Sequence, residues 1–143
     1  MFRSILVVCV GNICRSPMAE ALLRRRLQGR DISVSSAGLG ALVGNPADAI
    51  AQTLMSERGI DLSAHRARQF GAEYLCDAEL ILVMETWQQR EIEKKFPPAH
   101  GRVYRLGHWG NFDIADPYRK PRDAFERALA DIERGIDEWM KRL

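Results

Sequence analysis

Cys9-Val10-Gly11-Asn12-Ile13-Cys14-Arg15-Ser16 is the stretch that decides the fold of this chain, because it stands directly between a predicted strand and a predicted helix. The apolar run at residues 5–8 predicts a buried strand, and Pro17 predicts the start of a helix. In such a turn several backbone N–H groups point at one spot, and the helix N-terminus adds partial positive charge there. The stretch therefore predicts an anion site.

Two side chains of this stretch, Cys9 and Arg15, carry reactive chemistry and stand six residues apart. The planar fork of Arg15 fits a tetrahedral oxyanion at two points, and the same positive surroundings favour thiolate over thiol at Cys9. The segment thus predicts binding of a phosphate dianion and attack on its phosphorus. The spacing also leaves open a structural cysteine at a strand end, beside a solvated arginine.

The composition favours one globular domain over residues 1–143, with 46% hydrophobic residues and no apolar run long enough for a membrane span. The first residues lead straight into the first strand, so we expect no signal peptide, and three cysteines without a paired framework favour the cytoplasm. A net charge of +2 argues against a nucleic-acid partner. The three histidines are not spaced as metal ligands, so we expect no metal or cofactor.

Strand-like and helix-like segments alternate along the chain. The pattern predicts strands at 4–8, 32–35, 80–84 and 102–106, and helices at 17–27, 47–58, 71–76 and 86–95 before a long final helix. That last helix carries one core-facing stripe, formed by Phe125, Leu129, Ile132, Ile136, Trp139 and Leu143. The predicted fold is an α/β three-layer sandwich: a central parallel sheet of about four strands with helices on both faces.

A second loop, residues 107–121, follows the last predicted strand and therefore reaches the same edge of the sheet as the Cys9 loop. A thiolate that displaces an alkoxide or phenoxide needs a general acid opposite it. Asp113, Asp116 and Asp123 are the acidic candidates here, and Asp116-Pro117-Tyr118 is the best of them. Pro117 restricts the chain just after the acid, and Tyr118 offers an aromatic wall beside it.

Residues 8–17, together with Asp116-Pro117-Tyr118, resemble the low-molecular-weight protein tyrosine phosphatases. The resemblance covers nearly the whole chain, including Ser36-Ala37-Gly38 and residues 64–69. Residues 38–44, 106–109 and 116–120 resemble more narrowly the bacterial Wzb-type enzymes tied to capsule and exopolysaccharide export. The fold that this resemblance implies is the phosphotyrosine phosphatase I-like sandwich.

The resemblance implies a role for each matching residue. Cys9 would become a cysteinyl-phosphate, Arg15 would clamp the phosphoryl oxygens, and Asp116 would protonate the leaving tyrosine oxygen. Ser16 would donate a hydrogen bond to the Cys9 thiolate. The remaining expected substrate-binding residues are Val10, Gly11, Asn12, Ile13, Cys14, Leu39 and Tyr118.

A supporting network is implied as well, in which Asn12 holds the loop in its strained shape through bonds with Ser36 and His65. From the residues alone, Ser36 reads as a turn-former and His65 as a partly buried histidine with a satisfied ring. Cys14 leaves two readings open: a peroxide-induced disulfide with Cys9, or packing beneath the loop.

The implied partner is a phosphotyrosine protein, specifically an autophosphorylated membrane tyrosine kinase with a cytoplasmic tail, and the chain is expected to act as a monomer. Leu39, Leu42 and Tyr118 would form a groove for a flat ring, and a basic rim of Arg119, Lys120 and Arg122 would attract an acidic tail. Arg119 stands where animal members carry a second tyrosine, which puts regulation at that site in doubt.

Two other functions compete with this one. A thioredoxin-coupled arsenate reductase needs two further cysteines, and this chain has only Cys76 outside the loop, where we expect it to be buried in the core. A non-catalytic flavodoxin-like binding module has no use for a thiol in its phosphate loop.

Overall fold

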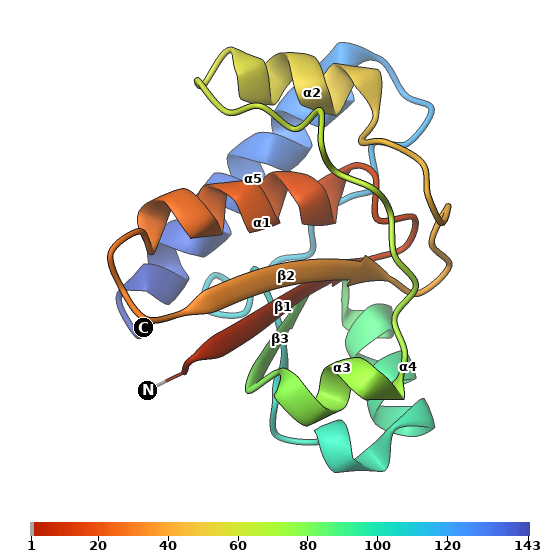
Figure 1. The fold of residues 1–143 in the computed structure, drawn as a ribbon, viewed down its shortest axis with the longest axis vertical. Helices are drawn as coiled ribbons and strands as arrows, with labels where there is room; N and C mark the ends of the chain where they lie inside the picture. The colour runs from red at the N-terminus through yellow and green to blue at the C-terminus, as the bar shows by residue number, and fades with distance from the viewer. Residues whose placement is uncertain (1) are drawn as a thin grey trace.

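Two apolar strands form the centre of a four-stranded parallel sheet in the computed structural model, which describes residues 2–143. The sheet has the order β2-β1-β3-β4 and consists of β1 (Ser4–Cys9), β2 (Ser33–Gly38), β3 (Leu80–Val83) and β4 (Val103–Arg105). β1 pairs with β2 and β3 in parallel, and β3 pairs with β4 in parallel. All four carboxyl ends therefore lie at one edge, as predicted (Figure 1).

Helices cover both faces of the sheet, which confirms the three-layer α/β sandwich (Figure 1). One layer contains α1 (Arg15–Arg26), α2 (Ala49–Ser56) and α5 (Arg122–Met140); the other contains α3 (Ala72–Asp77), α4 (Thr86–Lys95) and the 3₁₀ helix η1 (Pro97–Ala99). β1 supplies both cores by alternation: Ile5 and Val7 pack with the α1/α5 layer, and Leu6 and Val8 pack with the α4 layer.

The final helix buries the stripe that the sequence predicts. Phe125, Leu129, Ile132, Ile136 and Trp139 are all buried against the sheet, while Leu143 lies beyond the helix end and is only half-buried. Among residues 2–143, no helix has the length and apolarity needed to cross a membrane.

Three details of the predicted elements are wrong. α1 begins at Arg15 rather than at Pro17, since proline is tolerated in the first turn of a helix. β2 runs to Gly38, because the small residues after Ser35 continue its pairing with β1. Cys76 is exposed rather than buried, because α3 buries none of its residues completely and only half-buries Tyr74 and Leu75 against the core.

Candidate active site

The loop from Cys9 to α1 turns its carbonyl groups outward. The carbonyls of Cys9, Val10 and Gly11 accept hydrogen bonds from the N–H groups of Leu39, Gly40 and Leu42 at 2.9, 3.0 and 3.1 Å. Within the described chain, the backbone N–H groups of residues 10–16 have no hydrogen-bond acceptor in the protein. A loop whose carbonyls are bound outside and whose N–H groups are free inside is built to hold an anion.

Glycine is required where β2 passes this loop. A Cβ on Gly38 would lie 2.3 Å from the carbonyl oxygen of Val10, which is shorter than any real contact. The loop can therefore rest directly against the end of β2 only because residue 38 has no side chain.

Asn12 is the residue around which the loop is organised. Its backbone is left-handed, with φ of 59°, a conformation that asparagine tolerates better than most residues. Its Nδ2 donates to the hydroxyls of Ser16 at 2.7 Å and Ser36 at 3.0 Å, and its Oδ1 accepts from the backbone N–H of Arg68 at 2.8 Å. Its carbonyl oxygen lies 2.7 Å from Nε2 of His65. The residues of the expected supporting network are thus all in contact with Asn12.

The same network reaches the sulfur of Cys9. Ser16 Oγ lies 2.9 Å from Cys9 Sγ, and because that hydroxyl already accepts from Asn12, its own proton is free for the sulfur. Ser36 is placed in the same way: it accepts from Asn12 and donates to Oε1 of the buried Glu20 at 2.7 Å. The hydrogen bonds therefore run in one direction from Asn12, towards the thiol on one side and towards a carboxylate on the other.

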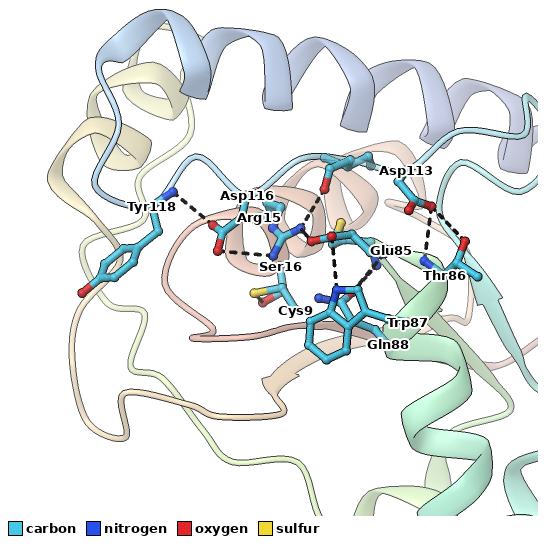
Figure 2. A network of polar contacts seen from close by, with 12 residues as sticks. Cys9, Arg15, Ser16, Glu85, Thr86, Trp87, Gln88, Asp113, Asp116 and Tyr118 are labelled. Carbon is cyan, nitrogen blue, oxygen red and sulfur yellow. Dashed lines mark hydrogen bonds and ion pairs between the residues drawn. The ribbon is translucent and has the colours of Figure 1, made fainter.

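The side chain of Arg15 is buried, with 1% exposure, and two acceptors fix one end of its guanidinium group (Figure 2). Its Nη1 donates to Oε1 of Glu85 at 2.5 Å and to the carbonyl of Ile114 at 2.7 Å. Both protons of Nη1 are thus used, so Nε and Nη2 remain for a ligand in the cavity that Arg15 lines. Nε and Nη2 make no hydrogen bond within residues 2–143, so they can supply the two-point contact that a phosphoryl group needs.

Asp116 comes from the late loop and faces Arg15, with Oδ2 3.7 Å from Nη2. Its Oδ1 accepts from the backbone N–H of Tyr118 at 3.0 Å, which orients the carboxylate (Figure 2). Of the other two candidate acids, Asp113 pairs with Arg105 at 3.0 Å and Asp123 lies in the first turn of α5, and neither lines the cavity. The tertiary structure therefore places Asp116, and not Asp113, opposite the nucleophile loop.

These groups surround a cavity of about 120 Å³. Its lining residues are Cys9, Val10, Gly11, Ile13, Cys14, Arg15, Gly40, Leu42, Asp116 and Tyr118. Leu39, which the sequence analysis expected in this wall, does not line it: its side chain packs against the core on the α4 side of the sheet, and Gly40 and Leu42 take its place. Asn12 and Ser16 likewise do not line the cavity but stand behind its wall.

Cys14, the residue just before α1, is a free, buried thiol that lines the cavity, as Cys9 is. Burial raises the pKa of the Cys14 thiol far above its usual range, and the nearby carboxylate of Asp48 adds to this effect. Cys14 is therefore protonated at neutral pH and is not a competing nucleophile.

Glu85 and Glu20 are two acidic residues of the site that the sequence analysis missed. Glu85 lies one residue past Met84, at the carboxyl end of β3, and such positions are where open α/β sheets bind ligands. That position was a usable signal. Glu20 offered none, because an acidic residue in the middle of a helix is most often solvated.

The fold and this site together define a class, the phosphatases that use a cysteine in an anion-binding loop. Residues 4–143 match the family described as low molecular weight phosphotyrosine protein phosphatase. The chain is 54% identical over 143 residues to the probable low molecular weight protein-tyrosine-phosphatase EpsP of Ralstonia nicotianae, covering 100% of this chain and 97% of EpsP. It is 44% identical over 144 residues to the low molecular weight protein-tyrosine-phosphatase Wzb of Escherichia coli, and the match covers 100% of this chain and 97% of Wzb.

Among solved structures, Vibrio vulnificus Wzb in complex with benzylphosphonate matches with a TM-score of 0.94 at 38% identity, covering 100% of both chains. The present chain therefore belongs to the family of low molecular weight phosphotyrosine protein phosphatases. Its activity is that of a protein-tyrosine-phosphatase, which confirms the expected enzyme class.

Proposed function

We propose that this chain removes phosphate from protein phosphotyrosine through a covalent intermediate on Cys9. The thiolate attacks the phosphorus to form an S–P bond, and the bond from phosphorus to the tyrosine oxygen breaks. Asp116 gives its proton to that leaving oxygen, while Arg15 and the free loop N–H groups bind the equatorial oxygens. The observation that carries the proposal is the meeting of Cys9, Arg15 and Asp116 around one cavity.

The second step returns the enzyme to its starting state. Asp116, now ionised, takes a proton from a water molecule, which attacks the phosphorus from the side that the tyrosine has left. The S–P bond breaks, inorganic phosphate forms, and Cys9 leaves as a thiolate. Ser16 stabilises this leaving sulfur, because its hydroxyl proton is directed at Sγ by the bond from Asn12.

The depth at which Cys9 lies in the cavity is our reason for proposing phosphotyrosine rather than phosphoserine as the substrate. All three of Cys9, Leu42 and Tyr118 line the cavity, but Cys9 is only 2% exposed while Leu42 and Tyr118 are each 38% exposed, so the sulfur is recessed below these two side chains. An aromatic ring can pass between these two side chains and carry its phosphate down to the sulfur. The shorter side chain of phosphoserine holds its phosphorus away from Cys9.

The first test compares three substrates. We expect a phosphotyrosine peptide to be hydrolysed at least about 10²-fold faster, by kcat/KM, than a phosphoserine peptide of the same sequence. We expect no thioredoxin-dependent reduction of arsenate. Equal rates on the two peptides would contradict the depth argument, and arsenate turnover would favour the reductase alternative.

We further propose that the partner is an autophosphorylated tyrosine kinase of exopolysaccharide or capsule production, whose cytoplasmic tail carries several phosphotyrosines. The supporting observation is the similarity to EpsP and Wzb along the whole chain. Vibrio vulnificus Wzb holds benzylphosphonate, an aromatic ring joined to a phosphate-like group, which suits the substrate class proposed here. On this proposal the chain acts in the cytoplasm, as a monomer.

The basic rim needs one correction before it is tested. Arg122 binds Glu57 through two hydrogen bonds of 2.7 and 2.9 Å, so its charge is already paired. Arg119 and Lys120 have no carboxylate partner within residues 2–143, and the Arg119 guanidinium lies 5.2 Å from the ring centre of Tyr118. We therefore assign the attraction of an acidic tail to Arg119 and Lys120.

The double variant Arg119→Glu/Lys120→Glu should lower kcat/KM on a multiply phosphorylated kinase tail by about 3–10-fold at low salt, and less at high salt, because the lost attraction is a screened one. Turnover of p-nitrophenyl phosphate, measured in parallel, corrects for any disturbance of Tyr118. Lys94→Glu/Lys95→Glu is the matched control, since it makes the same charge change at the far end of α4. Equal losses of kcat/KM on the kinase tail and on p-nitrophenyl phosphate would show that Arg119 and Lys120 do not attract the tail.

A further inference from the structure

Trp87 is a half-exposed aromatic residue in the first turn of α4, and it makes a specific polar contact. Its exposed fraction is 47%, yet its indole Nε1–H donates to Oε2 of Glu85 at 3.2 Å (Figure 2). The other oxygen of the same carboxylate, Oε1, accepts from Nη1 of Arg15 at 2.5 Å. One carboxylate therefore joins an exposed indole to the buried guanidinium of the active site.

The backbone of Glu85 is already fixed without Trp87. Oε1 of the buried Gln88 accepts from the N–H groups of Met84 and Glu85, at 2.8 and 3.0 Å. These bonds hold the chain at the start of α4, where Glu85 also forms a capping box by accepting from the backbone N–H of Gln88. The direction of the Glu85 carboxylate then depends on its contacts with Arg15 and Trp87. That side chain is 24% exposed, so water competes for its carboxylate.

We propose that Trp87 is a positioning residue, which acts through Glu85 to hold Arg15 in the orientation that binds the phosphoryl group. The indole N–H holds Oε2, and this keeps Oε1 turned towards Nη1. The carbonyl of Ile114 is the other anchor of Nη1, and a single anchor allows the guanidinium plane to rotate. Because Nε and Nη2 must meet two oxygens at once, such rotation weakens both binding and the transition state.

Trp87 is not a catalytic residue in this scheme. It does not line the cavity, and its link to the ligand passes through two further side chains. The inference rests on the proposed function for its kinetic readout only, because binding of an oxyanion can be measured without turnover.

The decisive variant is Trp87→Phe, which keeps an aromatic ring and removes the N–H donor. We expect the dissociation constant for inorganic phosphate, measured by calorimetry, to rise about 3–10-fold, and kcat/KM on p-nitrophenyl phosphate to fall by a similar factor, at an unchanged melting temperature. Trp109→Phe is the matched control: Trp109 is 41% exposed but contacts Arg142 and other aromatic rings rather than a site residue. It should leave phosphate binding unchanged.

A double-mutant cycle with Glu85→Gln tests the route of the effect. In the glutamine an NH2 group replaces one of the two carboxylate oxygens, and this group cannot accept from Trp87 while the remaining oxygen accepts from Arg15. Adding Trp87→Phe should therefore weaken phosphate binding little further. Additive losses of phosphate affinity in the double variant would contradict the proposal that Trp87 acts through Glu85. Unchanged phosphate binding in Trp87→Phe would contradict it as well. If the wild-type protein bound phosphate but did not cleave phosphotyrosine, the proposed function would be wrong. The phosphate affinities of the four variants in the cycle would still test the role of Trp87.

Discussion

Cys9→Ser should abolish turnover, with a loss of at least about 10⁴-fold, because a serine hydroxyl stays protonated at neutral pH and is a poor nucleophile towards phosphorus. Burial and the bond to Ser16 place the reacting atom correctly but do not replace the thiolate. The measurement is kcat on p-nitrophenyl phosphate, with phosphate binding followed by calorimetry in the same preparation.

Binding should survive this substitution, since Arg15 and the free loop N–H groups remain. Cys76→Ser is the matched control: it makes the same atomic change at an exposed thiol on α3 and should retain full activity. Residual turnover above about 1% of wild type, or an equal loss in Cys76→Ser, would refute the assignment of Cys9.

Asp116→Asn should lower kcat by about 10²–10⁴-fold on substrates with poor leaving groups, such as phenyl phosphate, and by much less on those with good ones. An amide cannot donate the proton that the departing oxygen needs, while a stable leaving group departs without it. The test is the slope of log kcat against leaving-group pKa, which should become steeper in the variant.

Asp113→Asn is the control that shows whether the loss is specific to Asp116 or follows from removing any carboxylate of the late loop. Asp113 accepts from the backbone N–H and the hydroxyl of Thr86, both at 3.2 Å, and pairs with Arg105, so it ties the late loop to α4. Its replacement should cost stability and leave the leaving-group slope unchanged. A steeper slope in Asp113→Asn than in Asp116→Asn would reverse the assignment.

Two of the wrong expectations concern the direction of a side chain. Cys76 was expected to be buried and is exposed, because α3 is a short helix with no fully buried residue. Leu39 was expected at the cavity and packs into the opposite core, while Leu42 lines the wall. In both cases the residue type is apolar, and only the local path of the backbone determines which way it points.

The basic rim shows that the sequence also does not reveal which charged side chains are paired. The sequence places Arg119, Lys120 and Arg122 in one short run, and nothing in that run distinguishes them. Glu57, the partner of Arg122, comes from the end of α2, far away in the chain. The pairing of a charge therefore depends on which segments the fold brings together.

By itself, the sequence determined what is local or periodic. The spacing of Cys9 and Arg15 between an apolar strand and a helix predicts the anion-binding loop, and the alternation of segments predicts the parallel sheet. Strand connectivity also predicts that the late loop reaches the same edge. These features follow from neighbouring residues and from the geometry of parallel strands.

Only the tertiary structure decided which distant groups meet at that edge. It placed Glu85 and the Ile114 carbonyl behind Arg15 and paired Asp113 with Arg105. The physical reason is that each of these contacts depends on side-chain direction and on the register of segments remote in the sequence. A shift of a few ångströms makes or breaks a hydrogen bond, and no local pattern records it.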